Sequence, residues 1–124
     1  MTRTYSTQIE AARMGIVTPE LEIVAAKENR SVDELLPLLA EGKMVIPANI
    51  HHTSIDPNGV GGMLRTKVNV NLGISRDCKD YNIEMKKVMR AVELGAESIM
   101  DLSSHGDTQP FRRKLCTECP AMIG

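Results

Sequence analysis

After Gly42 the chain alternates short apolar segments with an amphipathic one, and this alternation limits the possible folds more than any other feature. Residues 43–48, 66–71 and 98–102 are short and rich in apolar side chains, which is typical of strands. Residues 81–94 have helical periodicity. Strands that alternate with helices form βαβ units, in which the strands run parallel. The sequence therefore predicts an α/β fold with a parallel sheet.

The segment 81–94 is predicted to be an amphipathic helix. Its apolar face consists of Met85, Val88, Met89 and Val92. Charged side chains, Glu84 among them, are spread over the other faces. Gly95 is placed to end the helix.

The residues before this alternation are predicted to form a separate helical region, 1–42. Helix-start signals recur at Thr7, Thr18 and Ser31, each followed by apolar residues at helical spacing. Pro37 lies inside the third segment and is expected to shorten or kink that helix.

Residues 43–124 are predicted to form the first half of a (β/α)8 barrel. A further helix is expected from Asp107 to about Thr117, and residues 120–124 resemble the start of a fourth strand. A complete barrel of this kind takes roughly 250 residues. We therefore expect the first three βα units and the start of strand four, in an incomplete barrel.

The charge balance argues against a nucleic acid or an anionic membrane as partner. The chain has fifteen Lys and Arg residues and sixteen Asp and Glu residues, which gives a formal net charge of -1. No apolar run approaches the roughly 20 residues that span a bilayer, and the first ten residues are polar. We expect a cytoplasmic protein with its three cysteines as free thiols.

The second predicted strand carries a row of polar side chains. Lys67, Asn69 and Asn71 share one face, while Val68 and Val70 share the other. In a barrel this row would face the interior and rise to the mouth where substrates bind. An edge strand with one hydrated face explains the row equally well.

Polar residues also follow the ends of the predicted strands. Asn49 follows the first strand, Asn71 ends the second and Ser103 follows the third. In a barrel these ends converge on one pocket, which Asn49, Asn69 and Ser103 would line. The alternative is that loops after strands are polar in most proteins.

Two further patterns resemble metal or redox sites. Cys116 and Cys119 have C-x-x-C spacing, but this pair supplies only two of the four ligands of a structural zinc. We interpret them as incidental thiols at a helix end. His51 and His52 are adjacent and would point to opposite sides, so we interpret them as loop histidines. We predict no metal site in this chain.

Several segments together resemble the ThiC family of phosphomethylpyrimidine synthases. The resemblance extends from about Thr7 to Gly124, and the motifs occur in the family's order. They are Thr18-Pro19-Glu20, Ile46-Pro47-Ala48-Asn49-Ile50, Lys67-Val68-Asn69-Val70-Asn71-Leu72-Gly73, Gly95-Ala96-Glu97 and Met100-Asp101-Leu102-Ser103.

The resemblance implies a radical S-adenosylmethionine lyase. Family members form homodimers, fold as a (β/α)8 barrel behind an N-terminal region and act on 5-aminoimidazole ribotide. They use a 4Fe-4S cluster and S-adenosylmethionine to generate a 5′-deoxyadenosyl radical, and also a zinc or another divalent metal. Two substrate-contacting residues of the family map onto Asn71 and Met100.

The family's cluster-binding cysteines have no counterpart here. They form a C-x2-C-x4-C arrangement near the family's C-terminus, far from the positions of Cys116 and Cys119. The metal ligands also map beyond Gly124. We therefore interpret this chain as an N-terminal portion that is inactive alone.

Departures from the family pattern favour its branch that makes 5-hydroxybenzimidazole, the lower base of anaerobic cobamides. Ser104-His105-Gly106-Asp107 replaces the usual continuation of strand three, and Val70 and Leu72 replace Ala and Ile. The alternative product is the phosphomethylpyrimidine of the thiamin pathway, from the same substrate and cofactors. An alternative of another class is a non-catalytic binding or assembly subunit.

Overall fold

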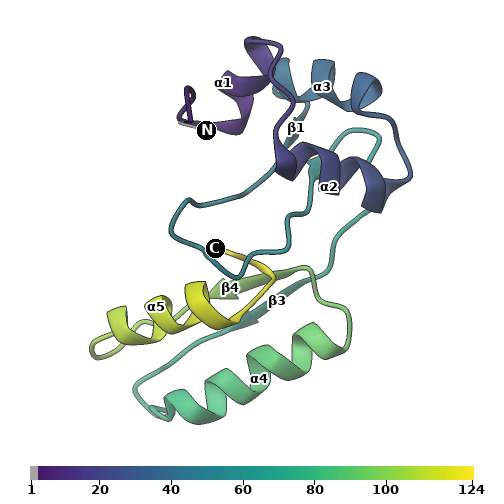
Figure 1. Cartoon of the computed structure of the whole chain (residues 1–124). Helices are drawn as coiled ribbons and strands as arrows, with labels where there is room; N and C mark the ends of the chain where they lie inside the picture. The colour runs from purple at the N-terminus through teal and green to yellow at the C-terminus, as the bar shows by residue number, and fades with distance from the viewer. Residues whose placement is uncertain (1–2) are drawn as a thin grey trace. The chain divides into compact units, whose positions relative to one another are not determined.

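The computed structural model describes residues 3–124, which divide into two compact units (Figure 1). The first unit consists of the described residues up to Ala48 together with Pro57–Thr66. The second consists of Asn49–Asp56 and Lys67–Gly124. Helices and two small sheets make the chain a mixed α/β structure. The half barrel, and the division of the chain into domains 1–42 and 43–124, stay predictions.

The first unit contains three short helices and a pair of short strands. The helices are α1 (Gln8–Arg13), α2 (Pro19–Glu28) and α3 (Val32–Ala40). The predicted helix starts are confirmed, since the side chains of Thr7, Thr18 and Ser31 each accept a hydrogen bond from a backbone N–H in the first turn.

Pro37 does not shorten α3, which continues to Ala40. Leu35 and Leu39 are buried on either side of the proline, and they pack against Leu21, Val24 and Met44 in the core of this unit. Burial of these side chains stabilises the turn that lacks the proline N–H.

The first predicted strand, residues 43–48, does not belong to a parallel sheet, so that part of the prediction is wrong. Only β1 (Met44–Val45) is a strand, and it pairs antiparallel with β2 (Val60–Gly61). A Cβ on Gly61 would lie 2.5 Å from the Lys43 carbonyl oxygen, so glycine permits this close return of the chain. Pro47 has no N–H with which to extend the ladder.

The second unit contains the predicted parallel sheet. Its strands are β3 (Asn69–Leu72), β4 (Ser98–Asp101) and β5 (Met122–Ile123), in that order and all parallel. Helix α4 (Tyr81–Glu93) joins β3 to β4, and α5 (Gln109–Glu118) joins β4 to β5. The residues expected to begin a fourth strand are therefore the third strand of this sheet.

Both connecting helices pack on the same apolar face of the sheet. Met85 and Val88 of α4 share a core with Phe111 and Leu115 of α5 and with Ile99 of β4. This confirms part of the predicted apolar face of α4, although Met89 is 39% exposed. Among residues 3–124, no helix has the length and apolar character needed to cross a bilayer.

Glu84 differs from the expectation that it lies on a face of α4 other than the one that packs on the sheet. It is completely buried. Its carboxylate has partners that local periodicity does not reveal, because one of them is a backbone N–H eleven residues earlier in the chain.

Candidate functional site

The face of the sheet opposite the helices carries the predicted substrate contacts. Asn69 and Asn71 are exposed on β3, whereas Val70 and Leu72 pack against the helical core, which confirms the alternation. Asn71 pairs in register with Met100 of β4. Residues opposite each other in a parallel ladder share a face, so Asn71 and Met100 are direct neighbours.

This arrangement leaves both interpretations of the polar row open. In the described part of the chain β3 has a neighbouring strand on one side only, so it is an edge strand. A barrel interior and a hydrated edge would both place these two asparagines on a face that is open in this structure. The interior position stays a prediction.

A hydrogen bond orients the carboxamide of Asn71. The Nδ2 atom of Asn69 donates to Oδ1 of Asn71 over 2.8 Å. An asparagine side chain has one acceptor oxygen and one NH2 donor. The bond fixes which side of the carboxamide carries the oxygen; the NH2 group remains a donor, and the oxygen can accept one further hydrogen bond. Sequence reasoning placed both residues on one face but did not reveal this polarity.

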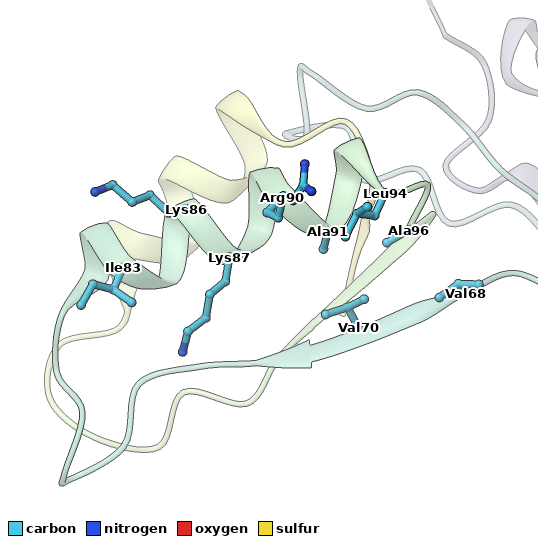
Figure 2. A pocket seen from close by; sticks show the side chains of 9 residues that line it. All are labelled: Val68, Val70, Ile83, Lys86, Lys87, Arg90, Ala91, Leu94 and Ala96. Atoms are coloured by element: carbon cyan, nitrogen blue, oxygen red, sulfur yellow. The ribbon is translucent and has the colours of Figure 1, made fainter.

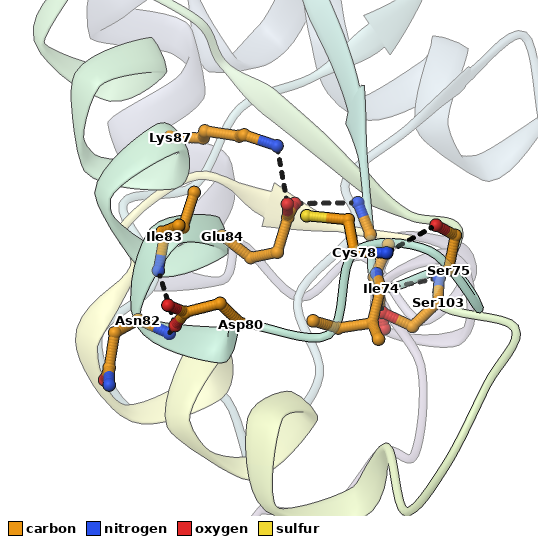
Figure 3. A network of polar contacts seen from close by, with 11 residues as sticks. Ile74, Ser75, Cys78, Asp80, Asn82, Ile83, Glu84, Lys87 and Ser103 are labelled. Atoms are coloured by element: carbon orange, nitrogen blue, oxygen red, sulfur yellow. Dashed lines mark hydrogen bonds and ion pairs between the residues drawn. The ribbon is translucent and has the colours of Figure 1, made fainter.

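At the carboxyl end of β3 a buried carboxylate binds the backbone. The Gly73 N–H donates to Oε2 of Glu84 over 3.0 Å, and Lys87 Nζ donates to Oε1 over 2.6 Å (Figure 3). The hydrogen bond to Glu84 raises the pKa of Lys87. Glu84 was not among the site residues predicted from the sequence. The one hint in the sequence is that Glu84 is next to Met85, which belongs to the predicted apolar face of the helix.

Ser103 joins the ends of β3 and β4. Its Oγ accepts from the Ile74 N–H over 3.0 Å and donates to Oδ1 of Asp101. Arg112 of α5 donates from Nε to the other carboxylate oxygen of Asp101 over 2.8 Å. The predicted role of Ser103 in lining a pocket stays a prediction, but its donor is already used within the fold.

The carboxyl group of Asp101 is held ionised by these contacts. Burial opposes its ionisation, but hydrogen bonds from Ser103 and Arg112 outweigh burial and lower the pKa of Asp101. A carboxyl whose folded pKa is lowered stabilises the fold fully above its unfolded pKa, and loses this contribution as the pH falls through the folded value.

Replacing Asp101 by asparagine should therefore flatten the acid limb of the stability curve. The free energy of unfolding of the unmodified protein should fall as the pH drops below about 4, the ordinary value for Asp. Asp101→Asn should be less stable at neutral pH and lose less in this window. Urea denaturation across the acid range measures both. An unchanged acid dependence in Asp101→Asn would contradict the assignment, and Arg112→Met should lie between the two.

Asn49 and the adjacent histidines belong to a loop of the same unit. Asn49 is exposed, and its Oδ1 accepts from the backbone N–H of His51 over 2.9 Å. His51 is exposed, whereas His52 is buried with Nε2 2.6 Å from the Cys119 carbonyl oxygen. The two rings thus have separate environments. That Asn49 lines the same pocket as Asn71 stays a prediction.

The cysteines do not form a cluster site in the described residues. Cys78 is exposed, Cys116 is half-buried and Cys119 is buried, and all three are free thiols. Burial raises the pKa of the Cys119 thiol, which disfavours the thiolate that a metal needs. Within residues 3–124 no three His, Cys, Asp or Glu side chains gather around one point where a metal could bind. This donor set does not fit a 4Fe-4S cluster, which takes its ligands from several Cys thiolates.

A groove lies on the helix side of the sheet, away from Asn71. Its volume is about 560 Å³, and one wall is formed by Val70 of β3 and by Val68 just before that strand (Figure 2). Helix α4 and the turn after it supply the other lining residues: Ile83, Lys86, Lys87, Arg90, Ala91, Leu94 and Ala96. The groove is therefore separate from the predicted substrate face.

Comparison with known proteins identifies related sequences. The model of the family described as "Radical SAM ThiC family" matches residues 7–124. Phosphomethylpyrimidine synthase of Clostridium botulinum (strain Hall) is 54% identical over 120 residues, and that of Clostridioides difficile (strain 630) is 57% identical over 120 residues. Each alignment covers 97% of this chain, and the chain spans 28% of the length of each relative.

Proposed function

This chain belongs to the radical SAM ThiC family, and on that premise we propose that it forms part of the substrate pocket of a phosphomethylpyrimidine synthase. The observation that carries the proposal is the in-register pair of Asn71 and Met100 on the open face of the sheet. The family resemblance assigns substrate contacts to these two positions. The names of the two relatives support the pyrimidine product.

The substrate that we propose is 5-aminoimidazole ribotide. Asn71 donates a hydrogen bond from Nδ2 to a ring nitrogen or a ribose oxygen, since the bond from Asn69 already engages one lone pair of its oxygen and orients the carboxamide. Met100 supplies a flexible apolar contact beside it, as a thioether side chain can. Together they hold one edge of the substrate and leave its other edge to residues outside this chain.

The cofactors that we propose are S-adenosylmethionine and a 4Fe-4S cluster, which supply radical chemistry in the whole protein. Their ligands, and those of a further divalent metal, come from residues outside this chain. We also propose that the sheet of β3, β4 and β5 is part of a (β/α)8 barrel and that the whole protein is a homodimer. Two consecutive βαβ connections on one face of the sheet support the barrel.

The product formed by the complete polypeptide tests the proposal. Purified anaerobically, it should convert 5-aminoimidazole ribotide in the presence of S-adenosylmethionine and a reductant. Mass spectrometry should identify hydroxymethylpyrimidine phosphate. Failure to convert this substrate, in a protein with a full cluster, would contradict the proposal and favour a non-catalytic subunit.

A second candidate product is 5-hydroxybenzimidazole, from the same substrate and cofactors. The variant segment Ser104-His105-Gly106-Asp107 and the residues Val70 and Leu72 favour it. The segment follows β4, and the Tyr81 hydroxyl donates to the Asp107 carbonyl oxygen. Detection of hydroxybenzimidazole in the same assay would replace the pyrimidine assignment and leave the family assignment unchanged.

A further inference from the structure

Glu84 is a buried carboxylate that the proposed substrate contacts do not use. Its side chain is 1% exposed on the face of α4 that also buries Met85 and Val88. Removing a carboxylate from water is costly unless hydrogen bonds and an opposite charge compensate. An apolar side chain would fill this position without that cost. The partners of Glu84 therefore indicate what the carboxylate does.

One partner is a backbone group that the sheet does not satisfy. The carbonyl oxygens of Val68, just before β3, and of Leu72 accept from the backbone N–H groups of Ser98 and Leu102, so the even-numbered residues of this segment direct their backbone groups to β4. The N–H of the odd-numbered Gly73 points to the other edge. There Glu84 Oε2 accepts its hydrogen bond at 3.0 Å.

A second side chain holds the next backbone N–H from the opposite direction. Ser103 Oγ accepts from Ile74 over 3.0 Å, and the Ser104 N–H donates to the Ile74 carbonyl oxygen over 3.0 Å. A Cβ on Gly73 would lie 2.5 Å from the Ser103 backbone nitrogen, so the chain already lies as near to β4 as it can. Glu84 opposes Ser103 across this segment (Figure 3).

We propose that Glu84 is a positioning residue that fixes the carboxyl end of β3 through the Gly73 N–H and so holds the Asn71 carboxamide toward the substrate. The inference rests on the proposed function, which makes Asn71 a substrate contact. Asn71 is two residues before Gly73, and its own neighbour on the ladder is Met100. Glu84 acts as a hydrogen-bond acceptor here, for the Gly73 N–H through Oε2 and for Lys87 Nζ through Oε1.

Two substitutions separate the acceptor from the charge. Glu84→Gln keeps the length of the side chain and an acceptor oxygen but removes the charge. Glu84→Asp keeps the charge but is one methylene shorter, so its oxygens no longer reach Gly73 at the present spacing. Lys87→Met is the matched control, because it removes the ion pair and leaves the Gly73 bond in place.

Calorimetric titration of the complete protein with 5-aminoimidazole ribotide measures the effect. Glu84→Asp should weaken binding about tenfold, whereas Glu84→Gln and Lys87→Met should stay within about twofold of the unmodified protein. Melting temperatures measured in parallel show whether each variant is folded. If the fold needed only the charge of Glu84, Glu84→Gln would bind the substrate weakly. Tight binding by Glu84→Gln therefore distinguishes the positioning role from a need for the charge.

Other outcomes would overturn the inference. Tight binding by a folded Glu84→Asp would show that Gly73 needs no acceptor at this place. Weak binding by a folded Glu84→Gln would show that the charge matters, and this variant alone decides the question if aspartate prevents folding. If the unmodified protein binds no 5-aminoimidazole ribotide, the proposed function fails first, and the positioning role fails with it.

Discussion

Replacing Asn71 by alanine is expected to weaken the binding of 5-aminoimidazole ribotide by about 1–3 kcal/mol and to leave the stability of the free protein nearly unchanged. The side chain is exposed, and its hydrogen bond to Asn69 is also exposed. Its loss therefore removes little from the fold. In the complex, however, the substrate would be left with a buried polar atom that lacks its partner.

Calorimetry with 5-aminoimidazole ribotide and a thermal melt of each protein test this expectation. Asn82→Ala is a matched control, because Asn82 is an exposed asparagine on α4, on the other side of the sheet. Its affinity should equal that of the unmodified protein. An Asn71→Ala variant that binds normally and melts far lower would mean that Asn71 serves the fold and that the pocket lies elsewhere.

The largest effect on stability is expected from Gly73→Ala. Gly73 has a φ of +149°, and a Cβ there would lie 2.5 Å from the Ser103 nitrogen and 2.7 Å from the Leu102 carbonyl carbon. A backbone conformation reserved for glycine costs an L-residue about 1–3 kcal/mol. Both clashing atoms are backbone, so the ends of β3 and β4 must also separate. We expect a total loss of at least about 3 kcal/mol in the free energy of unfolding.

Gly106→Ala separates backbone strain from this close approach. Gly106 has a φ of +74° and nothing within 4 Å of the added Cβ, so only the strain of about 1–2 kcal/mol applies. Urea denaturation of both variants measures the difference. Equal losses at the two positions would show that the contact between the ends of β3 and β4 adds nothing to stability.

Local signals explain why parts of the fold could be predicted from the sequence. Thr7, Thr18 and Ser31 mark helix starts because each binds a backbone N–H within its own first turn. The alternation along β3 follows from the geometry of any strand. The antiparallel pairing of β1 could not be predicted in this way, because it depends on where the chain returns at Gly61.

Part of the candidate site could likewise be predicted from the sequence, and part of it could not. Asn71 and Met100 could be named from the family resemblance, but their pairing depends on the register of β3 with β4, which two separate strands do not encode locally. Glu84 was placed with the charged residues on the other faces of the helix, because helical periodicity assigns only apolar side chains to the packed face. Its burial depends on the hydrogen bond from the Gly73 N–H, and this N–H lies next to Glu84 only after the sheet has formed.

The interleaving of the two units has a consequence for cleavage and truncation of the chain. The chain passes between them three times, after Ala48, Asp56 and Thr66, so a single cleavage at any peptide bond cannot release one intact unit from the other. The segment Asn49–Asp56 hydrogen-bonds the carbonyl oxygens of Cys119 and Pro120. A truncation that removes everything before Lys67 would leave these two acceptors without those partners. The unit that carries Asn71 is therefore built from two separate stretches of sequence, and its sheet depends on a loop that precedes part of the first unit in the chain.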